Sequence, residues 1–183
     1  MKIIIDAINI REGGGLTYLI NFLKNISSDQ SKNLKITLYI NKSASLLLPK
    51  RNWLVIKSLR LFDLPFPIRF FYQQFFLIKK INKDKYHLLF SPGGIIPFFC
   101  KLPTVSISQN LLPFELKEAR LFGNFNKMLF KMMLLRFIHR NSFKKASGVI
   151  FLSKYAIKII KNSINFDIKN KALIPHGIDF NFF

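Results

Sequence analysis

Three consecutive glycines, Gly13 to Gly15, follow the apolar segment KIIIDAI and precede apolar residues at helical spacing. The first turn of a helix has unpaired N–H groups and the positive end of the dipole, and glycines let a ligand approach the backbone. The sequence therefore predicts an anion-binding turn formed by Gly13, Gly14 and Gly15. The run matches neither GxGxxG nor a P-loop, and a tight turn that only requires positive φ is the alternative interpretation.

A second candidate site follows the strand-like segment PTVSIS. Gln109 and Asn110 come directly after it, and Glu115 lies five residues beyond Asn110. Amide side chains at a strand end can orient the hydroxyl groups of a polar ligand, and a carboxylate can serve as a base. The alternative is a turn-forming asparagine and a solvated glutamate.

The histidines give one further candidate. His87, His139 and His176 lack the spacing of metal ligands, so no metal site is predicted. We expect His139 to be structural because it lies in a helical stretch, and we expect His176, at a strand end, to lie near a cleft. Asp6, within the first strand, is expected to bond neighbouring backbone. No Ser-His-Asp order, paired-carboxylate motif or nucleophile elbow is visible in the sequence.

Short strands alternate with longer helices along the chain, which is typical of parallel βαβ units. Strands are expected at 2–8, 34–41, 53–57, 86–91, 103–108, 148–153 and within 171–179. Helices are expected at 16–26, 66–82, 116–145 (with an interruption near 123–124) and 154–162. The predicted fold class is α/β, a Rossmann-like doubly wound parallel sheet. Ligands bind such sheets at the carboxyl ends of the strands, where the loops REGGG, SPGG, SQNLLPFE and PHGID should converge.

The charge balance favours an anionic partner. The 183 residues contain 29 Lys and Arg against 9 Asp and Glu, a formal net charge of +20. Such an excess favours nucleic acid, phospholipid headgroups or a phosphorylated substrate, although AT-rich coding is an alternative explanation. The single cysteine, Cys100, excludes an intrachain disulfide and favours a reducing compartment.

Two helical segments raise the question of a membrane. No apolar run reaches the roughly 20 residues of a transmembrane helix, and the amino terminus does not resemble a signal peptide. Within 66–82, however, Tyr72, Phe75, Phe76 and Lys79 share a face, and 125–145 is apolar between cations. Such segments either form core helices with solvated rims or rest in a membrane interface.

Five segments in order resemble a known family: GGGLTYLINFL, LLFSPGG, VSISQNLLPFE, SFKKASGVIFLSKYA and ALIPHGID. Over nearly the whole chain they are similar to the amino-terminal domain of retaining glycosyltransferases of family 4, which have the GT-B fold. The resemblance implies transfer of a sugar from a nucleotide-sugar to a lipid-linked or polysaccharide acceptor in cell-surface glycan synthesis. No metal or cofactor is implied, because backbone dipoles and basic side chains stabilise the leaving diphosphate in this fold.

The resemblance also implies a domain organisation. Residues 1–178 would form the acceptor-side domain, and 179–183 would begin the link to a carboxyl-terminal domain that binds the nucleotide-sugar donor. That domain is absent from this sequence, so we expect a truncated or split gene product, or a chain whose partner domain is a separate polypeptide, and in each case a chain that is inactive alone. Substrate contacts would come from Gly13 to Gly15, Gln109, Asn110, Glu115 and His176.

One departure from the family concerns the catalytic residues. Gln109 and Asn110 stand where many relatives have a His-Asp pair, so no catalytic histidine is carried over. The expected location is cytoplasmic and peripheral, at the anionic inner face of the cell membrane. The alternative function is a non-catalytic binding or scaffold subunit for a membrane or a nucleic acid. The absence of RNP, zinc-knuckle and helix-turn-helix patterns argues against nucleic acid.

Overall fold

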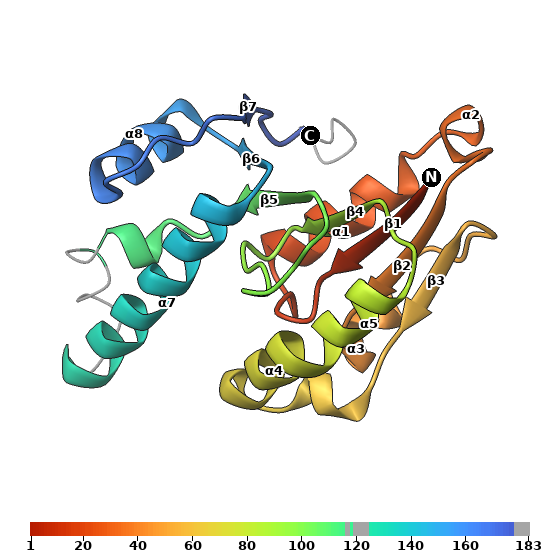
Figure 1. The fold of residues 1–183 in the computed structure, drawn as a ribbon, viewed down its shortest axis with the longest axis horizontal. Coiled ribbons are helices and arrows are strands. Elements are labelled where there is room, and N and C mark those ends of the chain that lie inside the picture. Colours follow the sequence, from red (N-terminus) through yellow and green to blue (C-terminus); the bar gives the residue numbers. More distant parts are fainter. Residues whose placement is uncertain (116–117, 119–124, 178–183) are drawn as a thin grey trace, which may run out of the picture.

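The computed structural model describes residues 1–115, 118 and 125–177, and its centre is a parallel sheet (Figure 1). Among the described residues the sheet has seven strands in the order β3-β2-β1-β4-β5-β6-β7, and every pairing is parallel. The strands are β1 (Lys2–Asp6), β2 (Lys35–Tyr39), β3 (Leu54–Lys57), β4 (Leu88–Ser91), β5 (Thr104–Ser108), β6 (Gly148–Phe151) and β7 (Lys171–Leu173). The predicted Rossmann-like doubly wound sheet is confirmed, and the strand order reverses between β1 and β4.

Helices connect the strands at the predicted places. The longer ones are α1 (Gly14–Lys24), α4 (Phe66–Tyr72), α5 (Ile78–Lys83), α7 (Phe125–Lys145) and α8 (Lys154–Ser163). Short elements that the sequence analysis did not predict are α2 (Ser28–Ser31), α3 (Lys42–Ser45), and the 3-10 helices η1 (Arg60–Asp63) and η3 (Leu112–Phe114). A capping box of Ser27 and Gln30 starts α2, and the Asn41 side chain caps α3. The expected helix start at 116, the break near 123–124 and the link at 178–183 lie outside the described residues.

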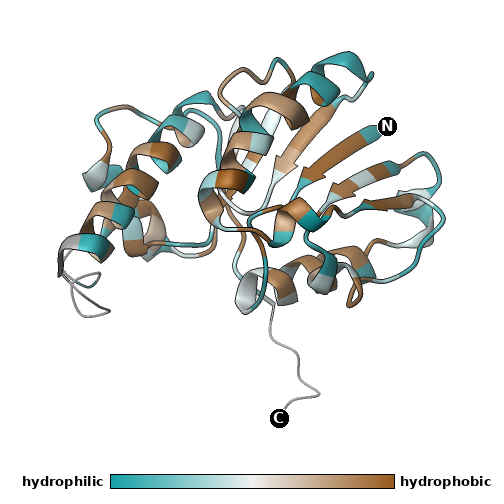
Figure 2. Ribbon diagram, turned by 90° about the horizontal axis from the view of Figure 1, so that it is seen from below, coloured by the Kyte–Doolittle hydropathy of each residue, from teal (hydrophilic) through white to brown (hydrophobic). Residues whose placement is uncertain are grey.

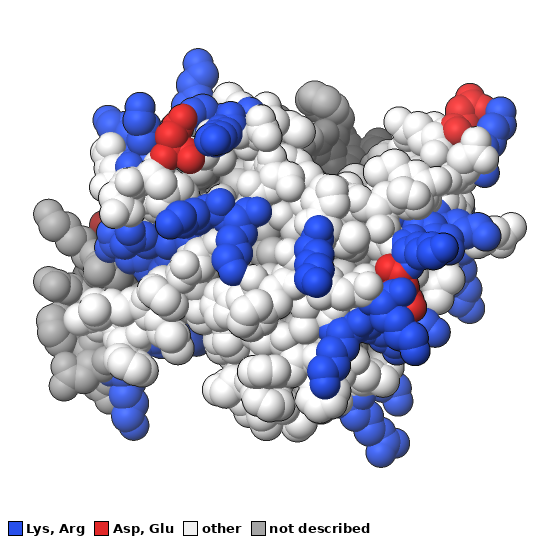
Figure 3. Space-filling view, in the orientation of Figure 1, with Lys and Arg blue, Asp and Glu red and all other residues white. Residues whose placement is uncertain are grey.

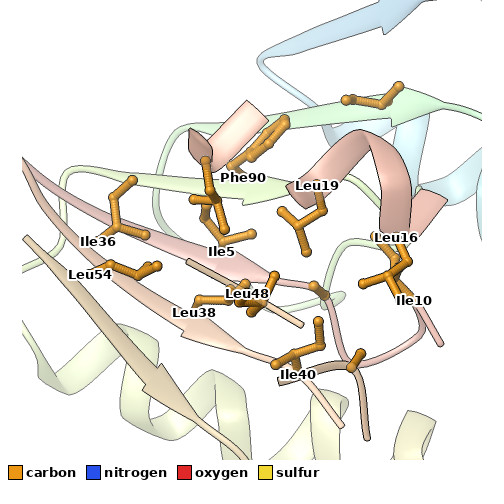
Figure 4. Packing of buried hydrophobic residues seen from close by; sticks show 14 residues of the cluster. Ile5, Ile10, Leu16, Leu19, Ile36, Leu38, Ile40, Leu48, Leu54 and Phe90 are labelled. Carbon is orange, nitrogen blue, oxygen red and sulfur yellow. The ribbon is translucent and has the colours of Figure 1, made fainter. Parts of the chain in front are cut away.

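Both faces of the sheet are covered, which explains the continuous β-branched run of β1. Ile4 and Ile5 point to opposite faces, and both are completely buried. On one face Leu16, Leu19 and Leu23 of α1 pack in the same core as Ile5 (Figure 4). On the other face, a core containing Ile4 is formed with residues of the α4–α5 region, Leu77, Ile78 and Ile81. Figure 2 shows the hydrophobic strands within more hydrophilic surroundings.

A third core lies beside β6, next to the edge strand β7. Phe143 of α7 packs there with Phe151 of β6 and Ile160 of α8, all of them buried. No helix in the part of the chain that the structure describes has the length and apolarity to cross a bilayer.

The helical segment between β3 and β4 contains a π turn, η2 (Gln73–Leu77), which joins α4 to α5. The wider turn places two consecutive polar residues, Gln73 and Gln74, in the interior. It also leaves two consecutive aromatic residues, Phe75 and Phe76, exposed at 49% and 56% of their surface. Of the aromatic residues expected to share a face in this segment, Phe75 and Phe76 are exposed, whereas Tyr72 is half-buried.

Candidate functional site

A cavity of about 290 Å³ lies at the carboxyl ends of β1, β4 and β5. Three of the four loops that were expected to converge contribute to its wall: the β1–α1 loop, the turn after β4 and the segment after β5. The cavity therefore lies at the point where the strand order reverses, the usual ligand position in an open α/β sheet. Its lining residues are Asn9, Ile10, Arg11, Glu12, Gly15, Phe66, Arg69, Gly93, Ile95, Gln109, Asn110, Leu135 and His139.

The glycine turn presents the start of α1 to this cavity. Gly13 has φ +70°, so the positive φ of the alternative interpretation is present. No side chain caps the first turn, while the N–H groups of Leu16 and Thr17 donate to the Gly13 carbonyl at 3.0 and 3.1 Å. Gly15 lines the cavity, whereas Gly13 and Gly14 are exposed just outside its lining. The uncapped helix start provides N–H donors at the mouth of the cavity.

Two arginines make the cavity positive. Arg69 of α4 is only 8% exposed, and its Nη1 donates to the Ile8 carbonyl at 3.0 Å. Its Nε has no hydrogen-bond partner within the described residues. Arg11 donates through Nη2 to the carbonyls of Asp63 and, at 2.9 Å, Leu64. Both guanidinium groups are thus held by carbonyl oxygens.

Neither arginine is neutralised by a carboxylate. Burial and the neighbouring Arg11 charge lower the pKa of Arg69, although a guanidinium remains charged at neutral pH. Glu12 also lines the cavity, but neither Arg11 nor Arg69 forms an ion pair within residues 1–115, 118 and 125–177. The cavity therefore has an excess of positive charge next to free backbone N–H groups.

Amide side chains complete the wall. Asn9 Oδ1 and Gln109 Nε2 are buried without a hydrogen-bond partner in the described part of the chain. A Cβ atom at Gly15 would lie 2.9 Å from Gln109 Oε1, so the glycine allows the amide to approach the helix start. Asn110 Oδ1 accepts from the N–H of Leu112 at 3.1 Å and thus forms a turn while lining the cavity.

His139 of α7 forms another part of the wall. It is buried, as expected of a structural histidine, but it also lines the cavity. Burial lowers the pKa of His139 from 6.5 to about 4, so the ring is neutral at pH 7. It lies against Gly94, whose φ is +80° and where a Cβ atom would come within 2.6 Å of His139 Cε1. The turn after β4 thus needs glycine for both its backbone and its contact with α7.

A buried network of hydrogen bonds involving Gln73, Asp6 and Ser91 stabilises the turn after β4. The Gln73 amide donates to Asp6 and, at 3.3 Å, to the Ile95 carbonyl, and the Ser91 hydroxyl donates to the same carbonyl at 2.6 Å. Asp6 also accepts from the N–H of Ile8 at 3.3 Å, as expected from the sequence. Burial raises the pKa of Asp6 from 3.8 to about 6, although both hydrogen bonds act in the opposite direction.

Hydrogen bonds to α7 also stabilise the turn after β4. The N–H of Ile96 donates to Ser142 Oγ at 3.0 Å, and that hydroxyl donates to the Ile138 carbonyl at 2.9 Å. Ser142 is fully buried. The wall of the cavity is therefore fixed by contacts from both helices that border it.

Two predicted site residues lie elsewhere. Glu115 accepts a hydrogen bond from the Tyr155 hydroxyl and does not line the cavity. His176 packs edge-on against Tyr18 at 5.5 Å between ring centroids, in a separate hollow over the outer side of α1. His176 follows β7, the edge strand, so the chain there is separated from β4 by two intervening strands and from β1 by three.

Four residues with a place in the cavity wall were not predicted as site residues: Asn9, Arg11, Arg69 and His139. A signal was present for Arg69, because it occupies the same helical face as Gln73 and Leu77, where an apolar residue is expected. A polar residue on the core-facing side of a helix indicates a buried hydrogen-bond partner or a ligand-binding site. For His139, only the tertiary contact between α7 and the turn after β4 reveals the position.

The described residues contain no cluster of three or more His, Cys, Asp or Glu side chains that could hold a metal ion. The groups that meet at the cavity are guanidinium, amide and backbone N–H donors, which suit a ligand with anionic oxygens and hydroxyls. No protein-family model and no curated protein matches this chain.

Proposed function

We propose that this chain is the acceptor-side domain of a retaining glycosyltransferase similar to family 4, and that its cavity binds a phosphate-bearing substrate. The observation that carries the proposal is the position of Arg69. A buried guanidinium with an unpartnered Nε lines a cavity at the switch point of the sheet, beside the uncapped start of α1. Guanidinium groups and helix N-termini are the usual binding groups for phosphate.

Each part of the cavity has a role in this proposal. Arg69, Arg11 and the first N–H groups of α1 bind phosphate oxygens. Asn9 and Gln109 orient hydroxyl groups of the substrate, because each has an unused buried polar atom. The donor nucleotide-sugar is bound mainly by a carboxyl-terminal donor-binding domain, and the two domains together stabilise the leaving diphosphate.

The proposal assigns no proton-transfer residue within this chain. His139 is neutral at pH 7 because burial lowers its pKa to about 4. Glu115 is directed to Tyr155 rather than to the cavity. The chain therefore contributes binding and electrostatic stabilisation.

The proposal includes peripheral association with an anionic membrane, where a lipid-linked acceptor would be found. Its support is an exposed aromatic cluster in which Phe71 lies 4.5 Å from Phe75 and 6.3 Å from Phe76 between ring centroids. Lys79 and Lys80 follow on α5, and both are exposed. Aromatic side chains beside lysines are typical of interfacial helices.

Sugar transfer tests the enzymatic part of the proposal. A panel of UDP- and GDP-sugars is incubated with membrane extract and this chain, with and without the product of the adjacent reading frame. We expect transfer only when a carboxyl-terminal donor-binding domain is present, and Arg69→Gln should reduce it at least tenfold, while Lys158→Gln on α8 should not. Substrate binding without transfer under any of these conditions would instead support a non-catalytic binding subunit.

Vesicle sedimentation tests the membrane part. Phosphatidylglycerol-containing vesicles should bind the wild-type chain, and Phe75→Ser/Phe76→Ser should weaken binding more than Lys154→Gln/Lys158→Gln on α8. High salt should release part of the protein, because charge interactions are screened. Equal binding by the aromatic variant and the wild type would contradict the assigned face.

A further inference from the structure

A second and larger hollow, of about 800 Å³, lies at the amino-terminal ends of the strands, on the side of the sheet opposite to the carboxyl-end cavity. It is formed where β1, β2 and β3 begin, together with the connection from α5 to β4. Lys2 and Lys35 are the first residues of β1 and β2, and Trp53 immediately precedes β3. In Figure 3 lysines and arginines gather over the right-hand end of the molecule, where Figure 1 places the starts of β2 and β3. This hollow is separate from the carboxyl-end cavity, and the two have no lining residue in common.

The hollow is strongly basic. Its lining includes five lysines, Lys2, Lys32, Lys35, Lys83 and Lys85, and a single carboxylate, Asp84. All five lysines are exposed. Only Lys32 forms an ion pair in the described part of the chain, with Asp29 at 2.9 Å. Four lysines therefore face one hollow without an ion-pair partner among the described residues.

The pairing of β1 with β2 places two of these lysines side by side. Lys2 and Lys35 are register partners in the parallel pairing of β1 with β2. Paired strands lie about 4.8 Å apart, and side chains in register point to the same face of the sheet. Like charges on such a pair destabilise a sheet unless another group compensates them.

Two aromatic side chains also line the hollow. Trp53 is half-buried and packs against the core on the α1 side of the sheet, and half-buried Tyr86 lines the hollow from the connection before β4. A ligand in this hollow would meet ammonium groups around apolar walls. Ammonium groups are compact point charges that bind phosphate without requiring a fixed direction.

We propose that this hollow is a binding site for a ligand that carries two or more phosphate groups. A single monovalent anion would neutralise one of the four unpaired lysines, whereas a polyphosphorylated group can contact several. The inference does not depend on the proposed glycosyltransferase function, because it uses neither the carboxyl-end cavity nor its residues. The phosphates could belong to a free ligand or to the headgroup of a diphosphorylated lipid.

The chain carries a built-in probe for this site, because Trp53 is its only tryptophan. We expect inorganic tripolyphosphate to change the Trp53 emission in a saturable manner at low salt, and salt to weaken the response by screening. Cardiolipin-containing phosphatidylcholine vesicles are tested beside pure phosphatidylcholine vesicles. A response to the vesicles with cardiolipin alone would assign the phosphates to a lipid, and a response to tripolyphosphate alone to a soluble ligand.

Three variants locate the response. Lys2→Gln/Lys35→Gln should weaken tripolyphosphate binding roughly 2- to 30-fold, the range expected for two exposed ion pairs. Lys154→Gln/Lys158→Gln removes two positive charges from α8, as many as the Lys2/Lys35 variant removes, and should change tripolyphosphate binding little. Arg69→Gln should preserve the Trp53 response even if it abolishes binding in the carboxyl-end cavity.

The proposal would be overturned by the absence of a saturable change in Trp53 emission with both ligands. It would also be overturned if the α8 variant lost as much affinity as the Lys2/Lys35 variant, since binding would then reflect net charge alone. Amide chemical shifts of the wild-type chain provide an independent readout that requires no variant. Shifts concentrated at Lys2, Lys35 and Tyr86 support the site, and shifts spread over the lysines of α8 contradict it.

Discussion

Two buried titratable groups should make opposite contributions to stability over the same pH range. The folded chain raises the pKa of Asp6 from 3.8 to about 6 and lowers that of His139 from 6.5 to about 4, in both cases mainly through burial. Each pKa unit corresponds to about 1.4 kcal/mol, so each group changes the free energy of unfolding by about 3 kcal/mol.

The direction follows from which state binds the proton. Between pH 6 and 3.8 the folded chain holds a proton on Asp6 that the unfolded chain has released, so stability rises as the pH falls. Between pH 6.5 and 4 the unfolded chain holds a proton on His139 that the folded chain excludes, so stability decreases as the pH falls. The two contributions nearly cancel in the wild-type chain.

Single substitutions should reveal each contribution. Asp6→Asn should remove the contribution of the Asp6 carboxyl. As the pH falls from about 6.5 to 4, the variant should therefore lose about 3 kcal/mol of unfolding free energy relative to the wild type. The Gln73 Nε2 that donates to Asp6 also donates to the Ile95 carbonyl, so the expected signal is the change of the stability difference with pH rather than its value at one pH. His139→Gln should do the opposite and gain about 3 kcal/mol relative to the wild type over the same range.

Urea unfolding at several pH values measures these differences. Comparison of each variant with the wild type at the same pH cancels the contributions of the other carboxylates. Asp84→Asn is the control for the loss of a carboxylate at an exposed position. Parallel profiles for Asp6→Asn and the wild type would refute the reasoning from burial.

Three substitutions test the contacts that fix the site and its neighbouring helix. Gly94→Ala should lower the free energy of unfolding by roughly 2–4 kcal/mol, because φ is positive there and a Cβ atom would lie 2.6 Å from His139. Gly93→Ala, where a Cβ atom would meet no heavy atom closer than 3.7 Å, should lower it little, and thermal unfolding compares the two variants. Ser142→Ala should cost about 1–3 kcal/mol in urea unfolding, because it leaves a buried N–H unpaired. Ser153→Ala should cost about 1 kcal/mol by removing the cap of α8, and amide exchange should increase in its first turn if the cap matters.

The strand-helix pattern could be predicted from the sequence because it depends on local periodicity. Buried parallel strands read as continuous apolar runs, as in KIIID, and amphipathic helices repeat every three to four residues. Their alternation then fixed the fold class. Gly15 and Gln109 could be expected at one cavity because the loop after β1 and the segment after β5 both follow strands that end on the same side of the sheet.

The remaining site residues depend on contacts that periodicity does not encode. The π turn shifts the register of the helix between β3 and β4, so that Gln73 and Gln74 are both buried, a pattern that a regular helix would not give. His139 reaches the cavity because α7 crosses the turn after β4. His176 lines a separate hollow beside α1 rather than the carboxyl-end cavity, because its segment follows β7 at the margin of the sheet.

The most direct test of the central claim is a titration of the isotope-labelled chain with pyrophosphate, followed by amide chemical shifts. If the carboxyl-end cavity binds phosphate, the N–H signals of Gly15 and Gln109 should shift with saturation, and Arg69→Gln should weaken that response at least tenfold while Lys158→Gln leaves it unchanged. Shifts absent from Gly15 and Gln109, or equal in Arg69→Gln and the wild type, would contradict the account.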